Sequence, residues 1–274
     1  AKSTSEVAWT VRGDRAHPSS KGMVCVKGAT IAEAIDQNRL LFPLLRDSLD
    51  EPFRRVTWDE ALDAIAQRIR HVLATQGPEA ICMYGSGQLQ TEDYYTAQKL
   101  LKGCLGTNNF DANSRLCMSS AVAAYIQSFG SDGPPPCYDD LEQTDCAFLI
   151  GTNTAECHPI VYNRFRKYHR KKKGKVTLIV VDPRRTETAK DADLHLAIRP
   201  GTDITLMNGI AHILLQKGWI DALFMDEATQ GFPDYAQVIQ HYSPDRVAEV
   251  CGIRVTDLEA AARAWGLSKR VLSL

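Results

Sequence analysis

Short, unbroken runs of apolar residues alternate with helix-like patterns in the second half of the chain. Residues 176–181 (VTLIVV) form a β-branched run of the kind that parallel sheets bury on both faces. The runs at 146–150 and 194–198 predict two more strands, and the segments 159–170 and 204–217 predict helices. Strands that alternate with helices build a doubly wound parallel sheet. We therefore expect an α/β fold with a Rossmann-like sheet domain in this half.

The first half predicts part of a second α/β unit. Thr57 and Glu60 have the spacing of a capping box, and apolar residues recur after them at helical spacing until Gly77 ends the helix. The other elements that we expect are a helix at 31–40, a buried strand at 80–87, a helix from about 92 to 101, a linker at 131–136 (SDGPPP), helices near 245–250 and 256–265, and a strand-like end at 271–274.

Composition narrows the class of protein. The 32 Lys and Arg residues nearly balance the 33 Asp and Glu residues, so no global field favours nucleic acid or anionic lipid. No apolar run reaches the ~18 residues of a membrane span, and the start lacks the apolar core of a secretory signal. The eight cysteines include no C-x2-C pair, which excludes zinc-ribbon and thioredoxin motifs, and we expect them to be reduced. Because the first residue is Ala, we expect an upstream segment.

Three loops follow predicted strands at the positions where open parallel sheets bind ligands. They are Gly151–Glu156, Asp182–Thr186 and Pro200–Asp203. An acid that closes a strand suits the donors of a ribose or a guanine edge, and neighbouring arginines suit phosphate. Taken singly, each loop has the residues of an ordinary turn or helix cap. The three together indicate a nucleotide-like ligand. The glycines of the motif at 85–87 (GSG) are too few for a dinucleotide fingerprint, which disfavours an ordinary NAD enzyme.

Cys117, within NSRLCMSSAV, has three possible roles: a core thiol, a nucleophile or a ligand for a soft metal. Arg115 would favour its thiolate and attract an anion, and a following helix start would lower its pKa. Other polar groups have simpler interpretations. We expect His158 and His195 to be hydrogen-bonded structural residues and the basic run 166–175 to be a solvated helix end. Cys82, Cys104, Cys146 and Cys251 lie in apolar stretches and are expected to pack as small hydrophobic side chains.

Several stretches together resemble a known family: GMVCVKGAT, VTWDEALDAIA, YGSGQLQTEDYYTAQKL, GTNNFDANSRLCMSSAV, GTNTAECHP and VVDPRRTETAKDADLHLAIRPGTD. They are similar to the catalytic subunits of molybdenum enzymes that carry bis(molybdopterin guanine dinucleotide), most closely the assimilatory nitrate reductases of bacteria and cyanobacteria. The last stretch is specific in both length and order, and the resemblance covers nearly the whole chain. It implies the molybdopterin oxidoreductase fold, with a Rossmann-like parallel sheet domain and part of a second α/β domain.

The resemblance assigns roles to individual residues. Cys117 matches the thiolate that binds molybdenum, a soft ligand for such a metal. Arg115 is a candidate for drawing in the anion, with a structural ion pair as the alternative. Met118 follows the nitrate reductase pattern, where formate dehydrogenases carry His. Gln88 and Asn113 match positions that contact the pterin. The positions that match nucleotide-binding segments are Gly151, Thr152, Asn153, Glu156, Asp182, Pro183, Arg184, Arg185, Thr186, Gly201, Thr202 and Asp203.

Cys25 and Lys27 match the fourth ligand of a 4Fe-4S cluster and the lysine between cluster and pterin. The other three cluster cysteines of the family precede the first residue here, and a cluster needs four. We therefore expect this chain to be a piece of a longer protein, truncated at both ends, that by itself lacks the cluster and is inactive. Residues 1–50 would be the remnant of an iron-sulfur domain, 51–130 a partial α/β domain that carries Cys117, and 131–274 the domain that binds the guanine dinucleotide.

The implied function is reduction of nitrate to nitrite by oxygen-atom transfer, in nitrate assimilation in the cytoplasm. The implied electron donor is a ferredoxin, a flavodoxin or a flavin reductase subunit, with no nucleic acid and no membrane as partner. One alternative is a molybdenum formate dehydrogenase. Another, from a different class, is a DNA-binding regulator, because residues 243–266 resemble a helix-turn-helix. The balanced charge and the few basic residues of its second helix disfavour that interpretation.

Overall fold

The computed structural model describes residues 9–35, 39–172 and 174–274. The chain forms two compact units. One combines the chain up to Ala32 with Pro136–Leu274, and the other is Glu33–Pro135. The division into three domains that we expect from the resemblance stays a prediction.

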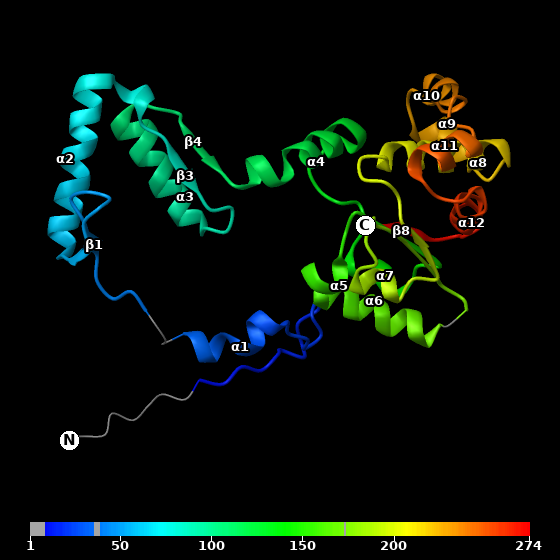
Figure 1. Cartoon of the computed structure of the whole chain (residues 1–274), viewed down its shortest axis with the longest axis horizontal. Coiled ribbons are helices and arrows are strands. Elements are labelled where there is room, and N and C mark those ends of the chain that lie inside the picture. The colour runs from blue at the N-terminus through cyan, green and yellow to red at the C-terminus, as the bar shows by residue number, and fades with distance from the viewer. Residues whose placement is uncertain (1–8, 36–38, 173) are drawn as a thin grey trace. The chain divides into compact units, whose positions relative to one another are not determined.

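The larger unit, Pro136–Leu274 with its N-terminal segment, is an alternation of strands and helices (Figure 1). Its elements are α1 (Val26–Ala34), η3 (Tyr138–Glu142), β5 (Cys146–Ile150), α5 (Thr154–Cys157), α6 (Pro159–Lys171), β6 (Thr177–Val181), α7 (Glu187–Lys190), β7 (Leu194–Leu196), α8 (Asp203–Gln216), α9 (Ala222–Ala228), α10 (Phe232–Ile239), α11 (Pro244–Cys251), α12 (Val255–Gly266) and β8 (Val271–Ser273).

The four strands of this unit form one sheet in the order β7-β6-β5-β8, and every neighbouring pair is parallel. Numbered from β5 along the chain, this order is 3-2-1-4, the beginning of the classic doubly wound arrangement. The expected α/β fold with a Rossmann-like parallel sheet is confirmed. The strand order reverses direction between β5 and β8, so the loop after β5 begins at the switch point where such sheets bind ligands.

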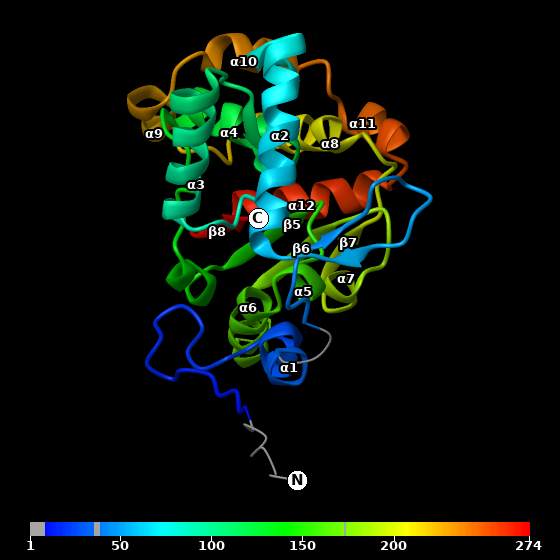
Figure 2. The ribbon, with the colours of Figure 1, turned by 90° about the vertical axis from the view of Figure 1, so that its left-hand side faces the viewer.

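Side chains of the central strands point alternately into two hydrophobic layers. Phe148 and Ile179 face α8, α11 and α12, whereas Leu149 and Leu178 face α6 and α7. Figures 1 and 2 show these two groups of helices on opposite sides of the sheet. Because both faces are covered, these strands tolerate only apolar side chains, which explains their unbroken apolar runs.

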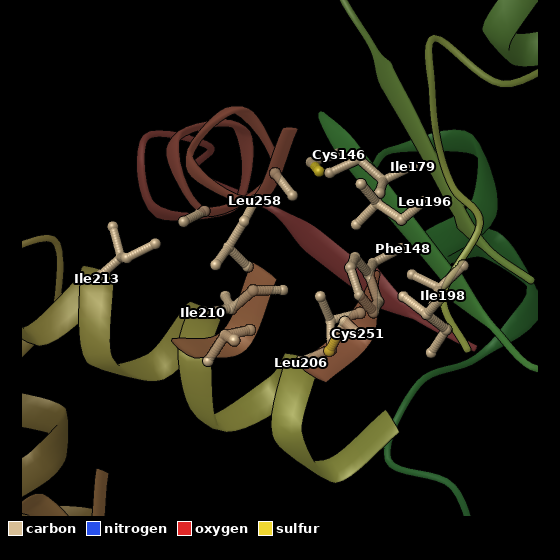
Figure 3. Close-up of a cluster of buried hydrophobic side chains, with 14 residues drawn as sticks. Cys146, Phe148, Ile179, Leu196, Ile198, Leu206, Ile210, Ile213, Cys251 and Leu258 are labelled. Carbon is tan, nitrogen blue, oxygen red and sulfur yellow. The ribbon is translucent and has the colours of Figure 1, made fainter. Parts of the chain in front are cut away.

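The layer against α8 is the larger of the two cores, and Figure 3 shows Leu206, Ile210 and Ile213 of α8 facing the strand residues. Cys146 and Cys251 lie inside this layer as expected, and burial raises the pKa of the Cys146 thiol to about 11. They therefore act as small apolar side chains.

The smaller unit, Glu33–Pro135, contains mostly helices (Figure 1). Its elements are β1 (Leu44–Leu45), β2 (Arg54–Arg55), α2 (Trp58–Gln76), η1 (Pro78–Ala80), β3 (Met83–Gly85), α3 (Thr91–Gln98), η2 (Lys99–Leu105), a π-helical turn, β4 (Phe110–Ala112) and α4 (Ser114–Phe129). β1 and β2 pair antiparallel, and β3 and β4 pair parallel.

Several expectations for the smaller unit are wrong. Residues 80–87 do not form a buried strand, because β3 pairs with β4 alone within the described chain and Tyr84 is 64% exposed. Cys82 and Cys104 are also exposed, so the expectation that they pack as small hydrophobic side chains is wrong. Only one of the two hydrogen bonds of the expected α2 capping box forms. Thr57 accepts a hydrogen bond from the Glu60 N–H, but the Glu60 carboxylate pairs with Arg54.

Two other corrections concern helices. The helix expected at 31–40 begins earlier, at Val26, where the Ala29 N–H donates to the Cys25 carbonyl; its residues 36–38 lie outside the described residues. The small residues before Ile31 carry no apolar period, so pattern alone did not indicate them. α9 and α10 were not expected. The predicted helices near 245–250 and 256–265 are present as α11 and α12, and their apolar faces lie in the core against α8.

Candidate functional site

The carboxyl ends of β5, β6 and β7 lie at one edge of the larger sheet, and the three predicted loops follow them. The register pairs Ile150 with Val181 and Val181 with Leu196. The Gly151 N–H donates to the Val181 carbonyl at 3.0 Å, and the Asp182 N–H donates to the Leu196 carbonyl at 3.2 Å. The first two loops therefore start side by side, as parallel pairing requires.

The first loop, Gly151–Glu156, is held by its own polar side chains. Gly151 has a φ of +64°, a left-handed conformation that suits glycine. The hydroxyls of Thr152 and Thr154 are 3.1 Å apart. The Asn153 amide donates to the exposed Glu156 carboxylate, while its oxygen accepts a hydrogen bond from Thr188 of α7 at 2.9 Å. These hydrogen bonds hold the loop in place, and the Glu156 carboxylate is exposed to solvent.

The second loop, Asp182–Thr186, combines an acid with two arginines. The Asp182 carboxylate accepts from the Arg184 N–H at 2.8 Å, and its carbonyl lies 2.9 Å from His195 Nε2. His195 is thus hydrogen-bonded, as expected. The buried Thr186 caps α7 by accepting from the Ala189 N–H. The side chains of Arg184 and Arg185 are exposed, and neither forms an ion pair within the described chain. Their guanidinium groups suit phosphate oxygens.

The third loop leads into α8. Gly201 has a φ of +82°, and the Thr202 hydroxyl donates to the Arg199 carbonyl at 2.7 Å. Because this hydroxyl makes no cap for α8, the first N–H groups of the helix have no side-chain acceptor from Thr202. Asp203, the first residue of α8, is exposed. Exposed carboxylates, guanidinium groups and a helix start together form a donor and acceptor set that fits a nucleotide.

A second strand-end site lies in the smaller unit, where β3 and β4 run parallel. Asn113, directly after β4, accepts a hydrogen bond through its side-chain oxygen from the Gly87 N–H. A Cβ at Gly87 would lie 2.9 Å from that oxygen, so this close approach requires glycine. The exposed Gln88 comes next, and its N–H donates to the Ser86 hydroxyl at 3.1 Å. The two residues that we expect to contact the pterin therefore share one edge of this sheet.

Cys117 lies in the first turn of α4, and its N–H donates to the Asn113 carbonyl at 3.0 Å. Its side chain is exposed, which excludes a core thiol and leaves the sulfur accessible to a metal. Arg115 pairs with Asp111 at 2.8 Å, and this hydrogen bond lowers the pKa of the Asp111 carboxyl. Both side chains of the pair are exposed. The roles of Cys117 and Arg115 stay predictions.

Cys25 and Lys27 lie at the start of α1, in the larger unit. The Gly28 N–H hydrogen bond is the largest cause that lowers the pKa of the half-buried Cys25 thiol, and the N–H and charge of Lys27 act in the same direction. A thiol that favours its thiolate suits a metal-ligand role. Within the described part of the chain, no group of three or more His, Cys, Asp or Glu side chains is placed to hold a metal ion. Cys25 and Cys117 would each contribute a single ligand.

Sequence reasoning missed the partners of these residues. Asp111 could have been found, because it lies four residues before Arg115 and the spacing suits an ion pair. Thr188 gave no comparable signal: it lies in a four-residue helix, and its partners Asn153 and Ala155 are more than 30 residues away in sequence.

The fold is that of an α/β protein whose loops after β5, β6 and β7 lie where open parallel sheets bind their ligands. A model of the molybdopterin oxidoreductase family matches residues 39–271. The chain belongs to this family, whose members carry a molybdenum–pterin cofactor, and the exposed thiol of Cys117 and the strand-end loops fit such a group.

Similar proteins extend this result. The chain is 62% identical to a nitrate reductase of Synechocystis over 97% of its own length and 37% of the relative. It is 32% identical to formate dehydrogenase H of Escherichia coli, over 92% of this chain and 36% of that protein. The acetylene hydratase of Pelobacter acetylenicus has a similar structure, with a TM-score of 0.78, 26% identity, and coverage of 94% of this chain and 35% of the hydratase. The chain thus spans just over a third of each relative's length.

In the part of the chain that the structure describes, no helix combines the length and the apolar character of a membrane span.

Proposed function

We propose that this chain is part of an assimilatory nitrate reductase that binds molybdenum as bis(molybdopterin guanine dinucleotide). The main support is the exposed Cys117, one turn into α4, beside the strand-end residues Asn113 and Gln88. The 62% identity to the Synechocystis nitrate reductase favours nitrate as the substrate. Similarity of fold alone does not decide the reaction, because a hydratase shares it.

The proposed overall reaction takes nitrate, two electrons and two protons to nitrite and water. The bound cofactor supplies the oxygen-atom and electron chemistry. The chain's own residues hold and orient it. The Cys117 thiolate is a soft ligand on a helix start, and Asn113 fixes the Gly87 turn through its side chain and the first turn of α4 through its carbonyl. Gln88 presents its amide at the same edge.

In the larger unit, the loops at the ends of β5, β6 and β7 bind the guanine nucleotide in this proposal. Glu156, Asp182 and Asp203 offer carboxylates to base or ribose donors, and Arg184 and Arg185 offer positive charge to phosphate. Arg115, although paired with Asp111, keeps an exposed side chain with which to attract nitrate.

The electron path is also a proposal. Cys25 would supply one ligand of a 4Fe-4S cluster completed by three cysteines of the longer protein, and Lys27 would be the lysine that the family places between cluster and pterin. The donor is a ferredoxin, a flavodoxin or a flavin reductase subunit, and the enzyme acts in the cytoplasm with neither nucleic acid nor membrane as partner. The roles of Cys25 and Lys27 follow from the family pattern around them, and the donor and the location follow from the resemblance to assimilatory nitrate reductases as a whole.

The test uses the full-length protein and the substitution Cys117→Ala. We expect loss of nitrate reduction, with Cys82→Ala as the matched control, because Cys82 is another exposed thiol of the same unit. Molybdenum content and the fluorescence of oxidised pterin are measured in parallel. Wild-type turnover by Cys117→Ala would exclude the ligand role. Dye reduction that depends on formate, without activity on nitrate, would instead support the formate dehydrogenase alternative, in which Met118 replaces the usual His.

A further inference from the structure

Thr188 lies under the nucleotide-binding edge and has no exposed surface. It belongs to α7, which follows the second loop, yet both hydrogen bonds of its hydroxyl reach the first loop. Its hydroxyl accepts from the Ala155 N–H at 2.9 Å and donates to the Asn153 side-chain oxygen at 2.9 Å. A hydroxyl has one hydrogen to donate, so this pair of bonds uses its donor and one acceptor site.

This arrangement decides which way the Asn153 amide points. Because the Thr188 hydrogen needs an acceptor, the Asn153 oxygen faces inward and its NH2 group is directed to the Glu156 carboxylate. A flipped amide would leave the Thr188 hydrogen without this acceptor and would set two acceptors against each other at Glu156. The orientation of the polar groups at the surface of the first loop therefore depends on a buried hydroxyl.

Thr188 also joins two loops that the sheet alone leaves separate. α7 is capped by Thr186, the last residue of the second loop, so the position of Thr188 follows that loop. Through Asn153 and Ala155 it transmits that position to the first loop. Ligand-binding loops that are already ordered lose less conformational entropy when the ligand binds.

We propose that Thr188 is a positioning residue for the guanine nucleotide, which orders the loop Gly151–Glu156 against the loop Asp182–Thr186 before the ligand arrives. This inference rests on the proposed function only in that the edge binds a guanine nucleotide. Thr188 itself contacts no ligand.

The experiment measures GDP affinity of the 274-residue chain by titration calorimetry. Thr188→Val keeps the side-chain shape but leaves the Ala155 N–H and the Asn153 oxygen without their partner, and we expect GDP to bind about tenfold more weakly. Thr188→Ser keeps the hydroxyl and should retain the wild-type affinity. If Thr188→Ser and Thr188→Val lose GDP affinity to the same extent, the proposal is overturned.

Thr144→Val is the matched control. Thr144 is also a buried threonine, and its hydroxyl bonds to the Cys146 and Arg270 carbonyls at the opposite end of β5. We expect this variant to lower the midpoint of thermal unfolding and to leave GDP affinity unchanged. If it weakens GDP binding as much as Thr188→Val does, the effect is one of general stability and the positioning role is wrong.

Two further results keep the outcomes distinct. If the wild-type chain does not bind GDP, the proposed nucleotide edge fails, and the inference fails with it. If wild type binds GDP and folded Thr188→Val binds equally well, only the inference fails. Should Thr188→Val not fold, hydrogen exchange of the free wild-type chain decides: the Ala155 amide must exchange slowly, and exchange at the rate of an open loop contradicts a loop ordered in advance.

Discussion

Arg164 of α6 should be the most sensitive charged residue of the larger unit. Its side chain is only 2% exposed and forms ion pairs with Asp139 at 2.7 Å and Glu142 at 2.9 Å. It also donates to the Ser19 carbonyl at 3.0 Å. The same guanidinium thus ties η3 and the N-terminal segment before Cys25 to α6.

The loss of stability expected on replacing Arg164 follows from these contacts. Arg164→Met keeps an unbranched apolar stem but removes two charge-assisted hydrogen bonds, each worth about 1.5–3 kcal/mol. The carboxylates left behind are not stranded, because Asp139 is 73% and Glu142 38% exposed and both regain water. The cost therefore stays below the full penalty of a broken buried pair, and we expect the free energy of unfolding to fall by about 2–4 kcal/mol.

Urea unfolding followed by circular dichroism measures this change, with Asp139→Asn as the control that should cost about 1 kcal/mol or less because Asp139 is exposed. Hydrogen exchange of the peptide that contains Ser19 should also become faster, since its carbonyl loses the anchoring guanidinium. A loss below about 1 kcal/mol together with unchanged exchange would refute the reasoning, because charge-assisted bonds of a buried guanidinium cannot be so weak.

Two more predictions concern the same unit. Hydrogen bonds from Lys21 first, and then from Arg164, lower the pKa of the Glu142 carboxyl, so its contribution to stability is present above the unfolded value of about 4.3 and is lost as the pH falls through the lower folded value. Glu142→Gln should therefore lower the free energy of unfolding at pH 7, by about 1 kcal/mol or less because Glu142 is partly exposed. In urea titrations at pH 3 the difference from wild type should be smaller. A difference that is larger at pH 3 than at pH 7 would contradict the lowered pKa. Gly209→Ala would place a Cβ 2.8 Å from both methyl groups of Val247, and we expect a loss of about 1–3 kcal/mol in urea unfolding. Adding Val247→Ala should remove the overlap, so strictly additive losses would show that overpacking is not the cause.

Much of the larger unit could be predicted from the sequence. Strand β5 coincides with the predicted strand, and β6 and β7 lie within theirs. Consecutive strand residues point to opposite faces, so the long apolar runs of β5 and β6 indicated strands that are covered on both faces. The short helices were harder. Of the three helices of seven or eight residues between 222 and 251, only α11 was predicted, because two turns hold few repeats of an apolar period.

The smaller unit was predicted less well, for a physical reason. An apolar run at 80–87 indicates burial only if another layer covers it, and in the described residues β3 has one strand neighbour and an exposed Tyr84. The apolar positions of α2 show the same limit, since Leu62 and Ile65 recur at helical spacing but are each 56% exposed. Periodicity predicted the element but not what covers it.

By itself the sequence predicted the strands β5, β6 and β7 with most of the helices between and after them, the loops at the strand ends and, through its family motifs, the residues expected to bind the cofactor. These depend on local spacing, which a chain carries along its length. Only the tertiary structure decided the partners: Gly87 with Asn113, Asn153 with Thr188 and Ser19 with Arg164, which lie 26, 35 and 145 residues apart. A hydrogen bond needs its two atoms within about 3 Å and correctly aligned, and no local pattern states which distant segments the packing of the sheet will bring that close.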